Sequence, residues 1–144
     1  MDVVPGTGDI VPEPHWRMLL NDELEIAAAA EHWRRIATEM KGRDILAPSN
    51  GHAVQRLVLS YVIYDRCSRE VAENGAVTKP KRGNPKAIAR LSPHFMAMRE
   101  AAQDAANLEA ELGLSPRRRA AAGKVAKKAR ADRASDAYLR PVAK

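Results

Sequence analysis

A helix-stop signal followed at once by a helix-start signal constrains this chain most. Leu112-Gly113-Leu114 places glycine where a left-handed residue commonly ends a helix, with leucines on both sides. Ser115-Pro116 supplies an N-cap residue and a proline suited to the first helical position. The same point divides the charge: residues 115–144 hold ten Lys/Arg and two acids, net +8, whereas the whole chain carries +6. A slightly acidic body therefore precedes a basic C-terminal segment.

Similar signals upstream predict two further helices. Asn21 or Asp22 is suited to cap a helix that Gly42 ends, and apolar residues recur between them at three- and four-residue spacing. One of residues 49–50 is suited to cap a second helix, which residues 74–75 (Asn-Gly) end. We expect the two helices, joined by a short loop, to pack as an antiparallel helical hairpin.

A long third helix is predicted from the pair Asn84-Pro85, an N-cap residue followed by proline, up to the glycine stop. Pro93 lies within this span, so the helix either kinks there or restarts from a Ser92 cap. Its apolar positions step by three or four residues, which places this helix against the hairpin or a neighbouring subunit: Ile88, Leu91, Phe95, Met98, Ala102, Ala105, Leu108 and Leu112.

The predicted fold class is all-α, with a disordered N-terminal arm (1–20), a helical oligomerisation core (21–114) and a basic C-terminal segment (115–144). The arm is rich in proline and glycine, and nothing periodic forms there. Aromatic residues make up only 4% of the chain, so the core is thin and gains from association between copies. The predicted core and oligomer residues are Trp33, Tyr61, Phe95, Met98, Leu108 and Leu112.

No catalytic or cofactor motif is present in the sequence. The four histidines do not share a helix turn, and Gly6-Thr7-Gly8 lacks the strand and the Gly-Lys that a phosphate loop requires. The single cysteine, Cys67, excludes an internal disulfide and fits a reduced cytosolic protein. These features favour a non-catalytic binding protein without metal or cofactor, although a site assembled only on folding stays an alternative.

Basic residues are the remaining functional signal, because Lys and Arg neutralise phosphates and release counterions. The predicted DNA-binding residues lie in a loop and in the C-terminal segment: Lys79, Lys81, Arg82, Arg117, Arg118, Arg119, Lys124, Lys127, Lys128 and Arg130. Six phosphate contacts from the C-terminal segment would give a log–log salt slope of about −5. The alternatives are a solvated loop and a solubility or partner-docking segment.

The order of these elements resembles the small subunit of tailed-phage terminases. The resemblance covers residues 20–120 and rests on Gly83-Asn84-Pro85 and on the turn Leu112-Gly113-Leu114-Ser115-Pro116-x-x-Arg119, in that order. It implies a small all-α protein that assembles into a ring and recognises viral double-stranded DNA in the cytoplasm of the infected bacterium. It also implies a partner, the large terminase subunit, which holds the ATPase and nuclease that the small subunit regulates.

Two features qualify this interpretation. Many terminase small subunits carry an N-terminal helix-turn-helix module, and the first 20 residues here are too short and too proline-rich to hold one. The DNA surface is then expected in the basic segments or on the inner wall of the ring. The turn at Gly113 also leaves open a cellular regulator of helix-turn-helix type, which would bind a short operator as a dimer.

Overall fold

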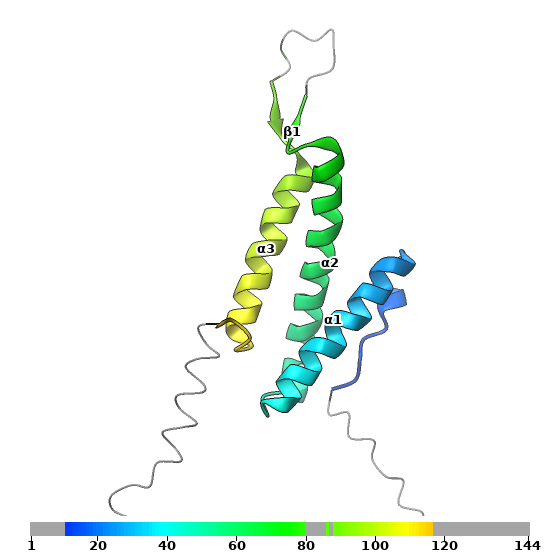
Figure 1. Ribbon diagram of the computed structural model, residues 1–144, viewed down its shortest axis with the longest axis vertical. Helices are drawn as coiled ribbons and strands as arrows, with labels where there is room; N and C mark the ends of the chain where they lie inside the picture. Colours follow the sequence, from blue (N-terminus) through cyan, green and yellow to red (C-terminus); the bar gives the residue numbers. More distant parts are fainter. Residues whose placement is uncertain (1–10, 80–85, 87, 117–144) are drawn as a thin grey trace, which may run out of the picture.

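The computed structural model describes residues 11–79, 86 and 88–116, which form three helices with a short β ribbon at one end (Figure 1). The all-α fold class predicted from the sequence is confirmed, and the ring assembly that accompanies it stays a prediction. In chain order the elements are η1 (Trp16–Met18), α1 (Glu23–Gly42), η2 (Pro48–Asn50), α2 (Gly51–Asn74), β1 (Val77–Thr78), β2 (Arg90–Leu91) and α3 (Pro93–Glu111).

The central element is α2, which lies between the other two helices (Figure 1). α3 runs alongside α2 in the opposite direction and packs on it most extensively, whereas α1 crosses α2 obliquely on the other side. Val54, Leu57 and Val58 of α2 are completely buried. α1 and α2 also run in opposite directions, as the predicted hairpin requires, but the longer contact is the one between α2 and α3.

The predicted boundaries of α1 are confirmed, and those of α2 are confirmed in part. Asp22 is the N-cap of α1, and its carboxylate accepts a hydrogen bond from the Leu24 amide at 2.8 Å. Asn50 occupies the N-cap position of α2, but its side chain makes no capping bond. Its amide group donates instead to the Ile45 carbonyl at 3.0 Å, which fixes the loop between the helices. Gly75, at φ +82°, ends α2 as predicted.

The third helix begins later than the pair Asn84-Pro85 predicts. α3 starts at Pro93, and the Ser92 hydroxyl accepts a hydrogen bond from the His94 amide at 3.2 Å, so the restart alternative is correct. The predicted helical turn around Ile88 and Leu91 is wrong. A residue before proline is biased away from helical angles, and Leu91 instead pairs with Val77 in the ribbon. Asn84 and Pro85 lie outside the described residues.

Residues 11–20 also differ from the predicted arm, because their later part packs on the body. Trp16 is 4% exposed and Leu20 is 6% exposed, and both belong to the hydrophobic core. The Trp16 indole meets Trp33 edge-on at 6.1 Å between ring centroids and donates its N–H to Glu13 at 3.0 Å. Burial of two large side chains overrides the local proline signal. The expectation for residues 1–10 lies outside the described residues.

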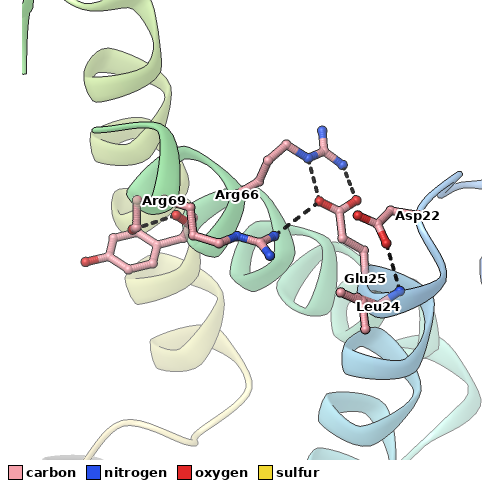
Figure 2. A network of polar contacts seen from close by, with 7 residues as sticks. Asp22, Leu24, Glu25, Arg66 and Arg69 are labelled. Atoms are coloured by element: carbon pink, nitrogen blue, oxygen red, sulfur yellow. Dashed lines mark hydrogen bonds and ion pairs between the residues drawn. The ribbon is translucent and has the colours of Figure 1, made fainter. Parts of the chain in front are cut away.

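A buried carboxylate ties α1 to the C-terminal half of α2 (Figure 2). Glu25, on α1, accepts two hydrogen bonds from Arg66 at 2.7 and 2.6 Å, and Arg69 approaches it at 3.7 Å. The hydrogen bonds from Arg66 lower the pKa of the Glu25 carboxyl and outweigh the opposite effect of burial. The ionised pair thus fixes where the N-terminal end of α1 crosses α2.

Candidate nucleic-acid interface

The β ribbon carries the first of the two basic segments and extends beyond the ends of α2 and α3 (Figure 1). Its strands pair antiparallel, with Val77 opposite Leu91 and Thr78 opposite Arg90. The Thr78 hydroxyl donates a hydrogen bond to the Arg90 carbonyl at 3.0 Å. At the base of the ribbon, the Ser92 amide donates to the Ala76 carbonyl at 2.9 Å. This pairing brings the two arms of the basic loop together at the end of the body.

The ribbon region is basic throughout, because residues 75–92 contain five Lys/Arg and no acid. Lys79, Lys86 and Arg90 are exposed there. Of the loop residues predicted to bind DNA, Lys79 therefore lies at the surface beside β1, whereas Lys81 and Arg82 lie outside the described residues. Exposed lysines and arginines of this kind attract the phosphate oxygens of nucleic acids.

The second basic segment begins from a turn that is held in the core. Gly113, at φ +73°, follows the end of α3, and Leu112 and Leu114 on either side are 8% and 5% exposed. Arg43, just beyond the end of α1, donates a hydrogen bond to the Gly113 carbonyl at 2.9 Å. The helix end predicted at Gly113 is confirmed. The turn holds Ser115-Pro116 against the body.

The predicted DNA-binding residues of the C-terminal segment lie outside the described residues: Arg117, Arg118, Arg119, Lys124, Lys127, Lys128 and Arg130. The structure does fix where this segment starts. α3 has 19 residues and is about 28 Å long at 1.5 Å per residue, so the ribbon and the start of the C-terminal segment lie about 28 Å apart.

A cleft of about 430 Å³ lies beside Pro116, between α1, α2 and the end of α3. Tyr61 donates a hydrogen bond to Glu109 at 2.5 Å, and Arg35 lies 3.0 Å from the His32 ring nitrogen. Burial, with a smaller contribution from Arg35, lowers the pKa of His32. Polar lining residues of this cleft are thus bonded to one another: Tyr61 to Glu109, and Arg35 to His32.

The described part of the chain contains neither a metal-binding group nor a membrane-spanning helix. No group of three His, Cys, Asp or Glu residues is arranged there to hold a metal ion. Within the same residues, no helix combines the length and the apolar character that a bilayer span needs. The cysteine, Cys67, is buried.

The predicted core and oligomer residues lie mainly inside the subunit. Trp33, Leu108 and Leu112 are buried in the core, and Tyr61, Phe95 and Met98 are partly buried. The apolar face of α3 points at α2 in the same subunit, which is one of the two alternatives left by the sequence. Trp33, Leu108 and Leu112 are therefore covered within the subunit itself. Sequence reasoning missed the burial of Trp16 and the Glu25–Arg66 pair, which join segments distant along the chain.

One comparison with known proteins gives a match. The family model described as phage terminase, small subunit, matches residues 29–129. That range covers most of α1, all of α2 and α3, the ribbon between them and part of the basic C-terminal segment. No curated protein and no solved structure matches the chain.

Proposed function

The chain belongs to the phage terminase small-subunit family, and on this premise we propose that it recognises viral double-stranded DNA at the start of packaging. In this role it presents the DNA to the large terminase subunit and regulates the ATPase and nuclease of that subunit, with no catalysis of its own. The complex would act in the cytoplasm of the infected bacterium. The match to most of the chain supports this assignment over a cellular regulator.

The observation that carries the DNA-binding part of the proposal is the placement of charge. Two basic segments, with net charges of +5 over residues 75–92 and +8 over 115–144, flank a body that is acidic without them. Their attachment points are about 28 Å apart along α3. Phosphates are therefore attracted to the two ends of α3 rather than to its surface, where residues 93–114 carry four acids and one arginine.

Assembly into a ring is the second part of the proposal. The subunit core is thin, with the large buried side chains concentrated around α2, so contacts between copies would add to its stability. Ring subunits contact one another through two different surfaces related by a closing rotation. A ring repeats both basic segments around its axis, which multiplies the phosphate contacts available to one DNA duplex.

The test compares DNA affinity across a salt series for four proteins. They are the full-length chain, the chain without residues 117–144, the ribbon variant (Lys79→Ala, Lys81→Ala and Arg82→Ala together), and a matched control, Arg34→Ala with Lys41→Ala. Both control residues are exposed on α1 and belong to neither basic segment. Fluorescence anisotropy gives the affinity, and native mass spectrometry gives the copy number.

Deletion of residues 117–144 should weaken binding and flatten the log–log salt slope by about 0.9 for every phosphate that the shortened chain no longer neutralises. The ribbon variant should flatten it less, and the α1 control should leave it unchanged. Loss of the ring is not expected in the deletion, because the described core lies between Trp16 and Leu114. Unchanged affinity and slope after deletion would contradict the proposal for this segment and assign it to docking on the large subunit.

A further inference from the structure

Three large apolar side chains are exposed in the short segment that leads into α1 and in its first turn. Met18 is 84% exposed, Leu19 is 46% exposed and Leu24 is 72% exposed, all within seven positions. We call them the α1 edge. Water-exposed apolar residues occur singly on most soluble proteins, but three so close together mark a surface that associates with another.

A second group of exposed apolar side chains lies where the ribbon joins α3. Ile88 is 77% exposed, Leu91 is 49% exposed and Met96 is 52% exposed. We call them the α3 edge. Figure 1 shows α3 on one side of α2, and α1 with η1 on the other. The two edges therefore belong to elements on opposite sides of α2.

Charge differs between the two edges in a complementary way. Beside the α1 edge, a hollow of about 630 Å³ is lined by Leu19, Leu20 and the acids Asp22, Glu70 and Glu73. Arg66 and Arg69 also line it, but both are directed to Glu25, as Figure 2 shows.

At the α3 edge the balance is basic. Arg90 and Arg99 are exposed there, and among the described residues 88–100 the one acid is Glu100. Met96, Arg99 and Gln103 line a shallow hollow of about 560 Å³ on the outer face of α3. An apolar surface with a basic rim thus lies on the opposite side of α2 from an apolar surface with an acidic rim.

We propose that the α1 edge of one copy packs against the α3 edge of the next, with Glu73 and its neighbouring acids meeting Arg90 and Arg99. This inference rests on the proposed ring and identifies its subunit contact. Two unlike surfaces on opposite sides of a subunit give a head-to-tail contact, which closes into a ring when the rotation between copies allows. Pairing of like edges would bring Asp22, Glu70 and Glu73 of two copies together, and like charges disfavour that arrangement.

The test uses one variant for each edge. Leu24→Lys places a cation where the basic α3 edge should dock, and Met96→Glu places an anion where the acidic α1 edge should dock. Ile63→Lys and Ile63→Glu are matched controls, since Ile63 is a 39% exposed apolar residue on α2 that belongs to neither edge. Circular dichroism verifies the helix content of every variant before native mass spectrometry at micromolar concentration.

Each edge variant alone should be monomeric, with association weakened by about tenfold or more, while both controls keep the ring. A one-to-one mixture of Leu24→Lys and Met96→Glu should associate more strongly than either variant alone, because the intact α3 edge of the first can pack against the intact α1 edge of the second. A ring that persists in both edge variants would overturn this interface and leave the proposed ring standing. A monomeric wild-type chain would overturn the ring itself and this contact with it.

A charge-swap pair tests the rim of the same contact. Arg99→Glu and Glu73→Arg should each weaken association, and the double variant should recover at least part of the loss, because the pair is restored with reversed sign. Additive losses in the double variant would overturn the pairing of these two residues. Homodimers of each single-edge variant would instead overturn the head-to-tail arrangement in favour of pairing between like edges.

Discussion

The two ends of α3 carry basic segments of similar character but hold them very differently. At the C-terminal end, Leu112 and Leu114 are buried in the core and Arg43 hydrogen-bonds the Gly113 carbonyl between them. At the N-terminal end, Val77 and Leu91 of the ribbon are 47% and 49% exposed, and each strand has two residues. Net charge alone therefore does not reveal which basic segment starts from a fixed point.

This difference has a physical consequence for DNA binding. A two-stranded ribbon is marginally stable in water by itself, because it buries little apolar surface. A segment that begins in the core starts from a position set by the whole body. In the proposed ring, the C-terminal segments would thus be presented at defined positions, whereas the ribbons would gain order from whatever they contact.

The largest effect should come from removing a buried side chain at the C-terminal end of α3, which we call the anchored end. Leu114→Ala removes a 5% exposed side chain and should lower the free energy of unfolding by about 2–5 kcal/mol. Val77→Ala in the ribbon should change it by no more than about 0.5 kcal/mol. Urea denaturation at fixed protein concentration measures both. A comparable cost at Val77 would mean that the ribbon unfolds with the core.

For glycine substitutions the order should be the opposite, with the ribbon end losing more stability than the C-terminal end of α3. Gly75, at φ +82° and ψ +165°, occupies a region that is essentially restricted to glycine, so Gly75→Ala should cost about 1–3 kcal/mol. Gly113, at φ +73°, should cost about 1 kcal/mol on change to alanine. A Cβ at either position meets nothing within 4 Å, so backbone strain alone sets both costs.

Asparagine separates the two glycines further, because it tolerates the left-handed helical region but not the region of Gly75. Gly113→Asn should recover part of the loss seen with alanine, and Gly75→Asn should not. Thermal unfolding of the four variants measures the difference. Equal recovery at both positions would show that the ribbon end adjusts its backbone, and that its glycine requirement is weaker than its angles indicate.

The sequence predicts the ends of the helices better than what lies between them. Asp22, Gly75, Ser92 and Gly113 act through their own backbone or the next turn, so local chemistry suffices to place them. The ribbon depends on pairing between Val77 and Leu91, which are fourteen positions apart, and the apolar spacing of Ile88 and Leu91 fits a helix equally well. Only tertiary contact distinguishes the two.

The candidate site likewise has features that local sequence predicts and features that depend on tertiary contacts. The exposure of Lys79 follows from composition, since a loop rich in lysine, proline and glycine lies at the surface. The fixed start of the C-terminal segment does not, because it requires Arg43 to reach Gly113 across seventy positions of sequence. Likewise, the α1 edge becomes visible only when Trp16 and Leu20 are known to be buried and Met18 and Leu19 are known to be exposed.

Arg43 offers a smaller test of the anchored end. Arg43→Gln removes the hydrogen bond to the Gly113 carbonyl and the 3.6 Å ion pair with Glu39. Because the Arg43 side chain is 27% exposed, water replaces part of the interaction, and we expect a loss of about 1–1.5 kcal/mol. Hydrogen exchange should show the loss of protection at the Leu114 and Ser115 amides. Arg34→Gln, exposed on α1 and outside both edges, is the matched control and should be neutral within about 0.5 kcal/mol.

A local effect should come from the cap at the N-terminal end of α3. Ser92→Ala removes the hydroxyl that accepts the His94 amide and should cost about 1 kcal/mol, while Ser92→Thr keeps a hydroxyl and most of the stability. The Ser92 amide still closes the ribbon on the Ala76 carbonyl in both variants. Hydrogen exchange should therefore rise at His94 and stay unchanged in the ribbon strands. If protection fell in the ribbon as well, the cap and the ribbon would form one cooperative unit, and the N-terminal end of α3 would be more firmly held than its exposed side chains indicate.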